Sequence, residues 1–498
     1  MLFTKLRFLF TICCFLVSAS AYWIGGYYEG YYEAWQEGEF KMNLTQPKHY
    51  LQLKTWLDPL PYSGIYIQGS ASTWENNAKV KFDRAFAEKT FFKKFKTFVL
   101  FEEERHWISS PLLYLVETGK VQKNPEAIRF DFWNIGNLRG TFIFSKDKIQ
   151  KDCEWYGNYF DVDGRSRIGR IEYYTPVFKT GINFIERKME YEKFSYQGST
   201  KTFLEKITRT NLVNSFDMKF DFPGFSLVGE FAKTTLNELD LKSNKAWQVE
   251  LRDFILGPFW FTISGFNYGR EFFVDSSRKF NGWDGNSEFG RKGIWSEMRF
   301  LIPRKAIDII YKVSTYKTDV ESVEANTDLR ESYIVNYSTT TNRIFWDFTQ
   351  IYARLLMGIN FRLGYERTQN KLKNQKKQNL MLKIQAESPR KLIGLIFKIA
   401  DYGKKTYPGQ KYIIGIEQKL NFGDRFQFYY RFAKGFTEDI FWHSGFFQLR
   451  YFIGYDFEIF FELGESWPTD SLYSSTTFSN NTSLEFSKVA KFIMKMSF

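Results

Sequence analysis

The 498-residue chain contains little cysteine, histidine or proline, with 3, 3 and 12 residues of these types. Cys13 and Cys14 lie in an N-terminal segment that we expect to be removed, which leaves Cys153 alone. A single cysteine excludes an intrachain disulfide and suggests no cysteine-based metal site. No long stretch rich in Pro, Gly or Ser, the usual composition of a linker, divides the chain. We therefore expect one domain.

Residues 1–21 have the pattern of a secretory signal peptide. Lys5 and Arg7 supply the charged start, residues 8–17 are apolar, and Ala19-Ser20-Ala21 forms a small-residue cleavage site. The apolar stretch is too short to cross a bilayer comfortably. We expect cleavage, so that the mature chain comprises residues 22–498.

The rest of the sequence has no run of about 18 apolar residues, so it predicts no transmembrane helix. Aromatic residues nevertheless make up 20% of the chain and charged residues 25%. Both kinds suit a wall that meets lipid on one side and water on the other. The remaining way to cross a membrane is a closed β-barrel, because every backbone N–H and C=O must be paired within the hydrocarbon.

Apolar and polar residues alternate along many short segments. In residues 484–498 one face carries mostly apolar side chains and the other mostly polar ones. The same period of two recurs on both sides of the Pro223-Gly224 turn and in segments 357–363, 426–432 and 457–463. Repeated segments of this kind, separated by turn residues, are the pattern of a transmembrane barrel.

The connections between these segments alternate between short and long. Tight turns are predicted at Thr175-Pro176, Pro223-Gly224, 256–258, 303–305, 388–390, 422–424 and 454–456, and long connections at 188–213, 233–245, 269–292, 318–331, 402–410, 434–445 and 466–482. Short periplasmic turns on one side and long extracellular loops on the other are typical of outer-membrane barrels.

Counting the turns gives the size of the barrel. We expect 11 hairpins, centred near residues 60, 94, 135, 175, 223, 257, 304, 352, 389, 423 and 455. A first strand within 27–42 and a last strand at 484–498 complete the count. The prediction is therefore an all-β fold, a single closed antiparallel transmembrane β-barrel of about 24 strands, within a range of about 20 to 26. Region 332–356 has the weakest turn signal, because its turn lacks Gly, Pro or Asp.

These features, together with the C-terminal segment from Phe492 to Phe498, resemble bacterial outer-membrane proteins of the porin type. In that class an amphipathic last strand with a terminal aromatic is the signal read by the barrel-assembly machinery. The resemblance gives that role to Phe492, Met494, Met496 and Phe498 and implies contact with outer-membrane lipid and lipopolysaccharide. It covers the mature chain at the level of architecture and identifies no subfamily.

A barrel of more than about 16 strands is too wide for its own side chains to fill, so it holds a water channel unless it is plugged. Fewer than about 20 residues separate the predicted cleavage site from the first strand, too few for a plug domain. The interior is then open, or narrowed by loops 188–213 and 269–292 folding inward. We expect a channel for passive or facilitated diffusion of small hydrophilic solutes and no enzymatic activity.

Charged side chains are expected on both the lumen wall and the rim. The lumen-lining basic candidates are Arg129, Arg139, Arg299, Lys312, Arg362, Lys383, Lys419, Arg431 and Arg450. Acidic residues alternate with them, so a solvated wall of paired charges is the first interpretation and a mild anion preference the second. The basic loop from Arg367 to Lys377 has no interleaved aromatics, which favours a solvated rim or a contact with lipopolysaccharide over nucleic acid.

Three inward aromatics, Trp133, Trp295 and Tyr429, are candidates for stacking against sugars, although interfacial girdles also use such residues. Asp275, Asp284, Asn286 and Glu288 are weak candidates for a Ca²⁺ site, and no cofactor is expected.

Two rival classes stay open. One is a polymer or secretion exporter; the other is an outer-membrane enzyme with a rim site, which would have to use His49, His106 or His443. The sequence gives no oligomeric state.

Overall fold

The computed structural model describes residues 22–37, 41–44, 48–58, 60–74, 77–102, 108, 110–116, 126–147, 149–155, 158–197, 200–237, 242–275, 277, 279–280, 288, 290–302, 306–325, 333–354, 358–371, 375–388, 390–401, 410–436, 441–454, 456–464 and 489–498. The predicted signal peptide lies outside these residues. Among the described residues, no helix is long and apolar enough to cross a membrane.

The regular elements of the described chain are all strands. In the first half they are β1 (Tyr22–Glu37), β2 (Lys41–Leu44), β3 (Lys48–Leu57), β4 (Ser63–Trp74), β5 (Asn77–Phe91), β6 (Phe95–Phe101), β7 (Glu126–Ile135), β8 (Leu138–Lys146), β9 (Gln150–Trp155), β10 (Asn158–Tyr174), β11 (Phe178–Gln197), β12 (Thr200–Phe222) and β13 (Phe225–Leu236). In the second half they are β14 (Lys245–Leu256), β15 (Phe259–Tyr268), β16 (Arg291–Ile302), β17 (Ile307–Ala325), β18 (Tyr333–Arg354), β19 (Ile359–Asn370), β20 (Gln375–Glu387), β21 (Lys391–Asp401), β22 (Gln410–Phe422), β23 (Phe426–Phe436), β24 (Phe441–Ile453), β25 (Phe457–Leu463) and β26 (Val489–Ser497).

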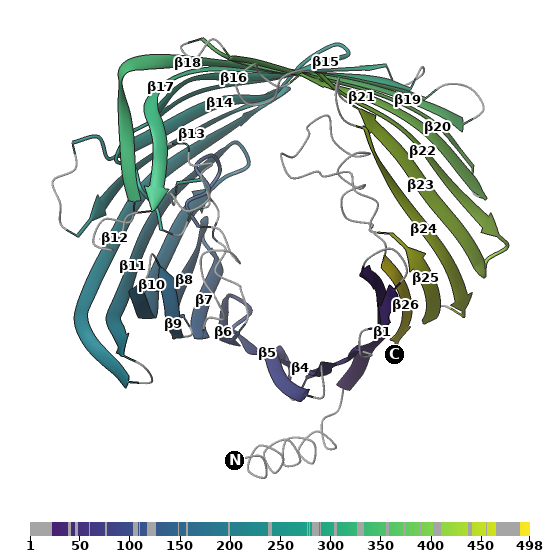
Figure 1. The fold of residues 1–498 in the computed structure, drawn as a ribbon. Coiled ribbons are helices and arrows are strands. Elements are labelled where there is room, and N and C mark those ends of the chain that lie inside the picture. Colours follow the sequence, from purple (N-terminus) through teal and green to yellow (C-terminus); the bar gives the residue numbers. More distant parts are fainter. Residues whose placement is uncertain are drawn as a thin grey trace.

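These 26 elements form a closed antiparallel barrel of 24 strands (Figure 1). The numbers differ because β2 and β3 both pair with β1 as two pieces of one strand, and β8 and β9 both pair with β10 as two pieces of another. The ring closes where β1 pairs with β26, from Tyr27 opposite Ser497 to Trp35 opposite Val489. The prediction of an all-β barrel of about 24 strands is confirmed.

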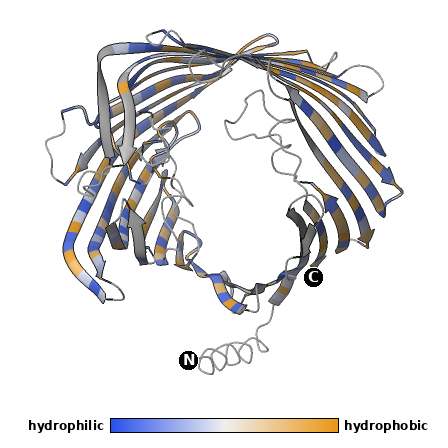
Figure 2. Ribbon diagram, in the orientation of Figure 1, coloured by the Kyte–Doolittle hydropathy of each residue, from blue (hydrophilic) through white to orange (hydrophobic). Residues whose placement is uncertain are grey.

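Hydrophilic and hydrophobic residues alternate along many of the strands (Figure 2). On β12, Phe216 and Met218 are 42% and 38% exposed, while Asp217 between them is buried. Apolar side chains are left exposed in this way only where lipid covers them, so the first set faces the membrane and the second the interior. Directly opposite residues of neighbouring strands share a face, so the inward set can be followed around the ring by register.

The predicted hairpins coincide with the short turns of the barrel, the one expected near residue 352 lying a few residues later, between Arg354 and Ile359. At the Pro223-Gly224 turn, Gly224 has φ +89°, a conformation that side chains other than hydrogen disfavour. The first strand begins at Tyr22 rather than within 27–42, and β26 begins at Val489, with residues 484–488 outside the described chain.

The prediction of a long loop at 188–213 is wrong. Residues 178–197 and 200–222 form the hairpin of β11 and β12, the longest paired segment of the barrel. The alternation continues there because Tyr191 and Ile207 pack with Phe160 and Val162 in a small apolar cluster of their own. The expected loop 318–331 is also shortened, because β17 runs to Ala325.

Candidate transport route and the segments that narrow it

One side of the inner wall carries a row of buried apolar side chains, flanked by buried ion pairs such as Arg170–Asp217 and Arg187–Asp147. Ile143, Ile168, Ile185 and Val213 stand directly opposite one another across β8, β10, β11 and β12. Ala232, Ala246 and Tyr268 stand opposite one another across β13, β14 and β15, displaced by one inward position because Val213 stands opposite Thr234. All seven side chains are buried. Such residues would be costly to leave in a water-filled lumen, so something must cover them.

The first cover is the connection between β6 and β7, of which residue 108 and residues 110–116 are described; we call these residues the first inner segment. Its apolar side chains, Ile108, Leu112, Leu113, Leu115 and Val116, are buried. Most of them belong to the same core as the apolar row of the wall, together with Phe86 and Phe98. The segment is therefore part of the folded interior.

A carboxylate of the wall fixes this segment. Glu230 on β13 accepts hydrogen bonds from the Ser110 hydroxyl at 2.7 Å and from the backbone N–H groups of Leu112 and Leu113 at 2.9 and 2.8 Å. The Arg252 guanidinium donates to the Pro111 carbonyl at 3.0 Å. Three donors converging on one buried carboxylate satisfy a charge that would otherwise be costly to desolvate.

The second cover is the connection between β15 and β16. Its residues 269–280, apart from 276 and 278, are described and form the second inner segment, with Phe272, Phe273, Val274 and Phe280 buried. Asn211 and Thr234 donate from the wall to the Phe273 carbonyl at 3.1 and 2.6 Å. The sequence prediction that loop 269–292 can fold inward agrees with this placement.

A buried ion pair also attaches the second inner segment to the wall. Arg209 Nη2 lies 2.7 Å from Asp275 Oδ1, with the two side chains 1% and 2% exposed. The Arg209 guanidinium also lies over the rings of Tyr191 and Phe273. A pair this deeply buried contributes to docking only while both partners are present.

Lys279 of the second inner segment contacts groups of the wall and of its own connection. Its ammonium donates to the Tyr268 hydroxyl at 2.8 Å and lies 3.2 Å from a Glu288 carboxylate oxygen. Burial lowers the pKa of the Lys279 ammonium, and the Glu288 carboxylate opposes that shift. The docked segment therefore favours the neutral amine more than water does.

The opposite side of the inner wall, along β16–β26 and β1, carries several cross-strand ion pairs; we call it the polar wall. Between these pairs it also has buried apolar side chains, namely Ile396, Ile413, Phe446, Phe460 and Ile493. Its pairs are Arg299–Asp308 (2.6 Å), Lys312–Glu297 (2.9 Å), Lys383–Glu417 (2.7 Å), Arg450–Glu458 (3.7 Å) and Lys495–Glu29 (3.6 Å). Most of these side chains are partly exposed, as expected of a wall that meets water.

Most of the sequence-predicted basic candidates lie on the polar wall, where Arg362 also donates to Gln350 at 2.7 Å. Arg431 is buried, and its guanidinium lies over the rings of Tyr429 and Phe446. Lys419, opposite Tyr429, has no acidic partner among the described residues. Arg129 and Arg139 instead belong to the covered side, paired with Asp131 and Glu172.

The three aromatic candidates do not come together. Trp133 lies near the turn between β7 and β8, and Trp295 packs against the core that the inner segments complete. Tyr429 is on the polar wall, where its hydroxyl donates to Glu417 at 3.3 Å.

The residues suggested for Ca²⁺ have other partners where they are described. Asp275 pairs with Arg209, and Glu288 with Lys279 and Arg291. Asp284 and Asn286 lie outside the described residues. No cluster of three or more metal-binding side chains occurs within the described part of the chain.

The histidines form no described pair with a carboxylate. His49 Nδ1 lies 2.9 Å from the Tyr28 hydroxyl, on the membrane-facing side of β3. His106 and the side chain of His443 lie outside the described residues.

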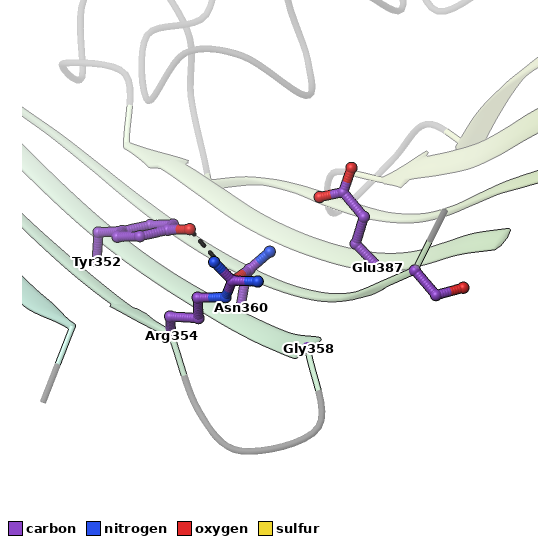
Figure 3. A pocket seen from close by; sticks show the side chains of 6 residues that line it. Tyr352, Arg354, Gly358, Asn360 and Glu387 are labelled. Carbon is purple, nitrogen blue, oxygen red and sulfur yellow. Dashed lines mark hydrogen bonds between the residues drawn. The ribbon is translucent and has the colours of Figure 1, made fainter. Parts of the chain in front are cut away.

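A cavity of about 310 Å³ opens at the end of β18–β20 where the tight turns lie (Figure 3). It is lined by Tyr352, Arg354, Gly358, Asn360, Glu387 and Ser388, and the Tyr352 hydroxyl donates to Asn360 Oδ1 at 3.2 Å. Gly358 has φ +74°, and a Cβ there would lie 2.5 Å from the Glu387 carbonyl oxygen, so only glycine fits. Within the described chain, Arg354 has no acidic partner.

The C-terminal strand has the predicted facing. Phe492, Met496 and Phe498 are 40%, 38% and 50% exposed, and Met494 stands on the same face. The Gly26 N–H donates to the Phe498 carbonyl at 2.6 Å and so ties the last residue to β1.

The sequence prediction missed the first inner segment. Its signal was an apolar run, Leu112-Leu113-Tyr114-Leu115-Val116, in a connection that should be polar on the outside of a cell. Phe272-Phe273-Val274 gives the same signal in the second segment. The sequence around Glu230 likewise gives no sign that this residue fixes the first segment.

The fold is similar to that of solved outer-membrane β-barrels. The structure is similar to that of a variant of the ferric enterobactin receptor PfeA from Pseudomonas aeruginosa in complex with enterobactin, with a TM-score of 0.51, 7% identity, and 95% of this chain and 81% of that chain covered. The siderophore receptor PirA from Pseudomonas aeruginosa gives a TM-score of 0.49 at 8% identity, covering 95% and 80%. The translocation pore of the P pilus usher PapC gives 0.38 at 7%, covering 95% and 99%. Neither a protein-family model nor a curated protein sequence matches the chain.

Proposed function

We propose that the protein is a channel of the outer membrane for small hydrophilic solutes, by passive or facilitated diffusion, and that the two inner segments narrow it. Solutes then move along the polar wall. What supports the proposal is the contrast between the two sides of the lumen. The inner segments cover the apolar row on β8–β15, while ion pairs along β16–β26 such as Arg299–Asp308 and Lys312–Glu297 are partly exposed, as on a surface that water solvates.

A mild anion preference fits the same route. Lys419 on the polar wall and Arg354 at the periplasmic mouth have no acidic partner among the described residues. Unpaired cations along a narrow passage lower the barrier for anions and raise it for cations. The neighbouring ion pairs keep this preference small.

Conductance in a planar bilayer tests the proposal with the purified full-length protein. We expect steady current without added ligand, and a reversal potential in a salt gradient that gives a modest preference for anions. Absence of current from a correctly folded barrel would contradict the proposal.

The same recording separates the rival classes. A gated exporter would pass little current until its inner segments are released, and an enzyme none in either condition. Arg209→Met, which we expect to release the second inner segment, supplies the second condition.

A further inference from the structure

The outer face of β16–β19 changes character along the strands. Near the tight turns, Ile309, Ile351 and Leu363 stand directly opposite one another. Their face is the outer one, because the alternate residue Tyr316 packs against the core inside the barrel. Membrane-facing apolar side chains are expected at this end.

Toward the loop end, the same outer face carries a row of cations. Lys292 stands opposite Lys317, and Lys317 opposite Arg343. The Lys371 N–H donates to the Arg343 carbonyl at 3.1 Å, which continues the register after Ile344 opposite Asn370. Lys292, Lys317, Arg343 and Lys371 are all exposed; we call them the basic row.

Like charges placed directly opposite one another on neighbouring strands repel, so the basic row is costly by itself. Among the described residues, none of its four members forms an ion pair. A second outward row, Lys146–Arg165–Lys188 on β8, β10 and β11, differs in this respect. There Arg165 pairs with Asp163 at 3.3 Å and Lys188 with Glu190 at 2.7 Å. Among the described residues, ion pairs are therefore found in the second of these rows and not in the first.

The height of the basic row fits a membrane surface. Arg343 is eleven residues from Arg354, the last residue of β18 before its tight turn. At about 3.3 Å per residue and a tilt of about 40°, that is about 28 Å along the membrane normal. The apolar band of an outer-membrane barrel is about 25 Å tall. The basic row therefore lies at the loop-side edge of the apolar band, beyond the outward Asp347–Arg367 pair on the same face.

We propose that the basic row binds the phosphates of a lipid A-type glycolipid. Phosphate oxygens accept charge-assisted hydrogen bonds from the lysine ammonium groups, and the Arg343 guanidinium offers two parallel donors. One bisphosphorylated headgroup would bridge neighbouring cations and remove their repulsion. The site is on the outer surface and is independent of the proposed channel function.

The test compares the wild-type barrel with a variant carrying Lys292→Gln, Lys317→Gln, Arg343→Gln and Lys371→Gln. The matched control carries Lys146→Gln, Arg165→Gln and Lys188→Gln in the paired row. Bisphosphorylated lipid A is added to each purified protein in detergent, and bound lipid per barrel is measured by native mass spectrometry together with the shift in thermal unfolding. We expect binding to weaken about tenfold or more in the basic-row variant. In the control it should change little.

Other probes distinguish the sources of phosphate. Dephosphorylated lipid A, phosphatidylglycerol and inorganic phosphate should each bind the wild type more weakly than bisphosphorylated lipid A. Equal binding of any of the three would overturn the proposal, as would unchanged lipid A binding in the basic-row variant. If that variant does not fold, Arg343→Gln alone and the probe series on the wild type decide the outcome.

Discussion

The two sides of the barrel wall use the same residue types in opposite ways. On the covered side, Arg209 and Asp275 form an ion pair that is 1% and 2% exposed and holds a loop against the wall. On the polar wall, Arg299 and Asp308 form a pair of similar geometry that is 43% and 19% exposed. Because it is buried, the first pair holds the loop in place. Because it is exposed, the second pair is solvated by water and contributes little to stability.

The largest expected effect comes from breaking the buried pair. Arg209→Met leaves the Asp275 carboxylate buried without a partner, which costs about 3–5 kcal/mol of docking free energy. We expect the second inner segment to detach and single-channel conductance to rise while the barrel stays folded. Unchanged conductance would show that this segment does not limit the lumen.

Two controls sharpen that comparison. Arg299→Gln on the polar wall should cost less than about 1 kcal/mol, because the pair that it breaks is solvated. Combining Arg209→Met with Asp275→Leu removes both buried charges and should return conductance most of the way toward the wild-type level.

A smaller effect is expected for Glu230→Leu. The leucine side chain accepts no hydrogen bond, so the Leu112 and Leu113 N–H groups lose the Glu230 Oε2 atom to which both donate, at a cost of about 1–3 kcal/mol. Hydrogen exchange of these two amides should become faster. Exchange at wild-type rates would mean that apolar packing alone holds the first inner segment.

The attachment of the second inner segment should depend on pH. Because burial lowers the pKa of Lys279, the free segment binds more protons than the docked one between that lowered pKa and the ordinary value of 10.5. Docking therefore strengthens as pH rises through this window and weakens as pH falls. Conductance should therefore decrease with rising pH in the wild type, and Lys279→Met should abolish that pH dependence. The same pH dependence in both proteins would show that Lys279 is not the group responsible.

The smallest effect concerns selectivity. Lys419→Gln with Arg354→Gln should reduce the anion-to-cation permeability ratio by less than about twofold, since exposed charges are screened by salt. Arg129→Gln on the covered side is the matched control and should leave the ratio unchanged. If Arg129→Gln changed the permeability ratio more than the double variant does, a solute route along the polar wall would be contradicted.

The barrel could be predicted from sequence because its signal repeats. A period of two over some two dozen segments and the alternation of turn lengths gave the strand number, and the Pro223-Gly224 turn needed only local chemistry. Loop 188–213 was misjudged because charged residues such as Lys188, Glu190 and Lys206 replace the apolar outer face there, while Tyr191 and Ile207 keep the inner face apolar.

The inner segments could not be placed from the same signal. The run from Leu112 to Val116 has no strand partner, so its apolar character indicates burial without saying against which surface. The contacts of Glu230 with Ser110 and of Arg209 with Asp275 join residues far apart in the chain. Alternation along a strand carries no information about such contacts.

Thiol accessibility tests the division of the lumen most directly. In a Cys153→Ser background, Val213→Cys on the covered row and Lys312→Cys on the polar wall are each exposed to a membrane-impermeant thiol reagent during current recording. The division predicts that the reagent modifies residue 312 and reduces the current, and leaves residue 213 unmodified. Equal modification at both positions would contradict it.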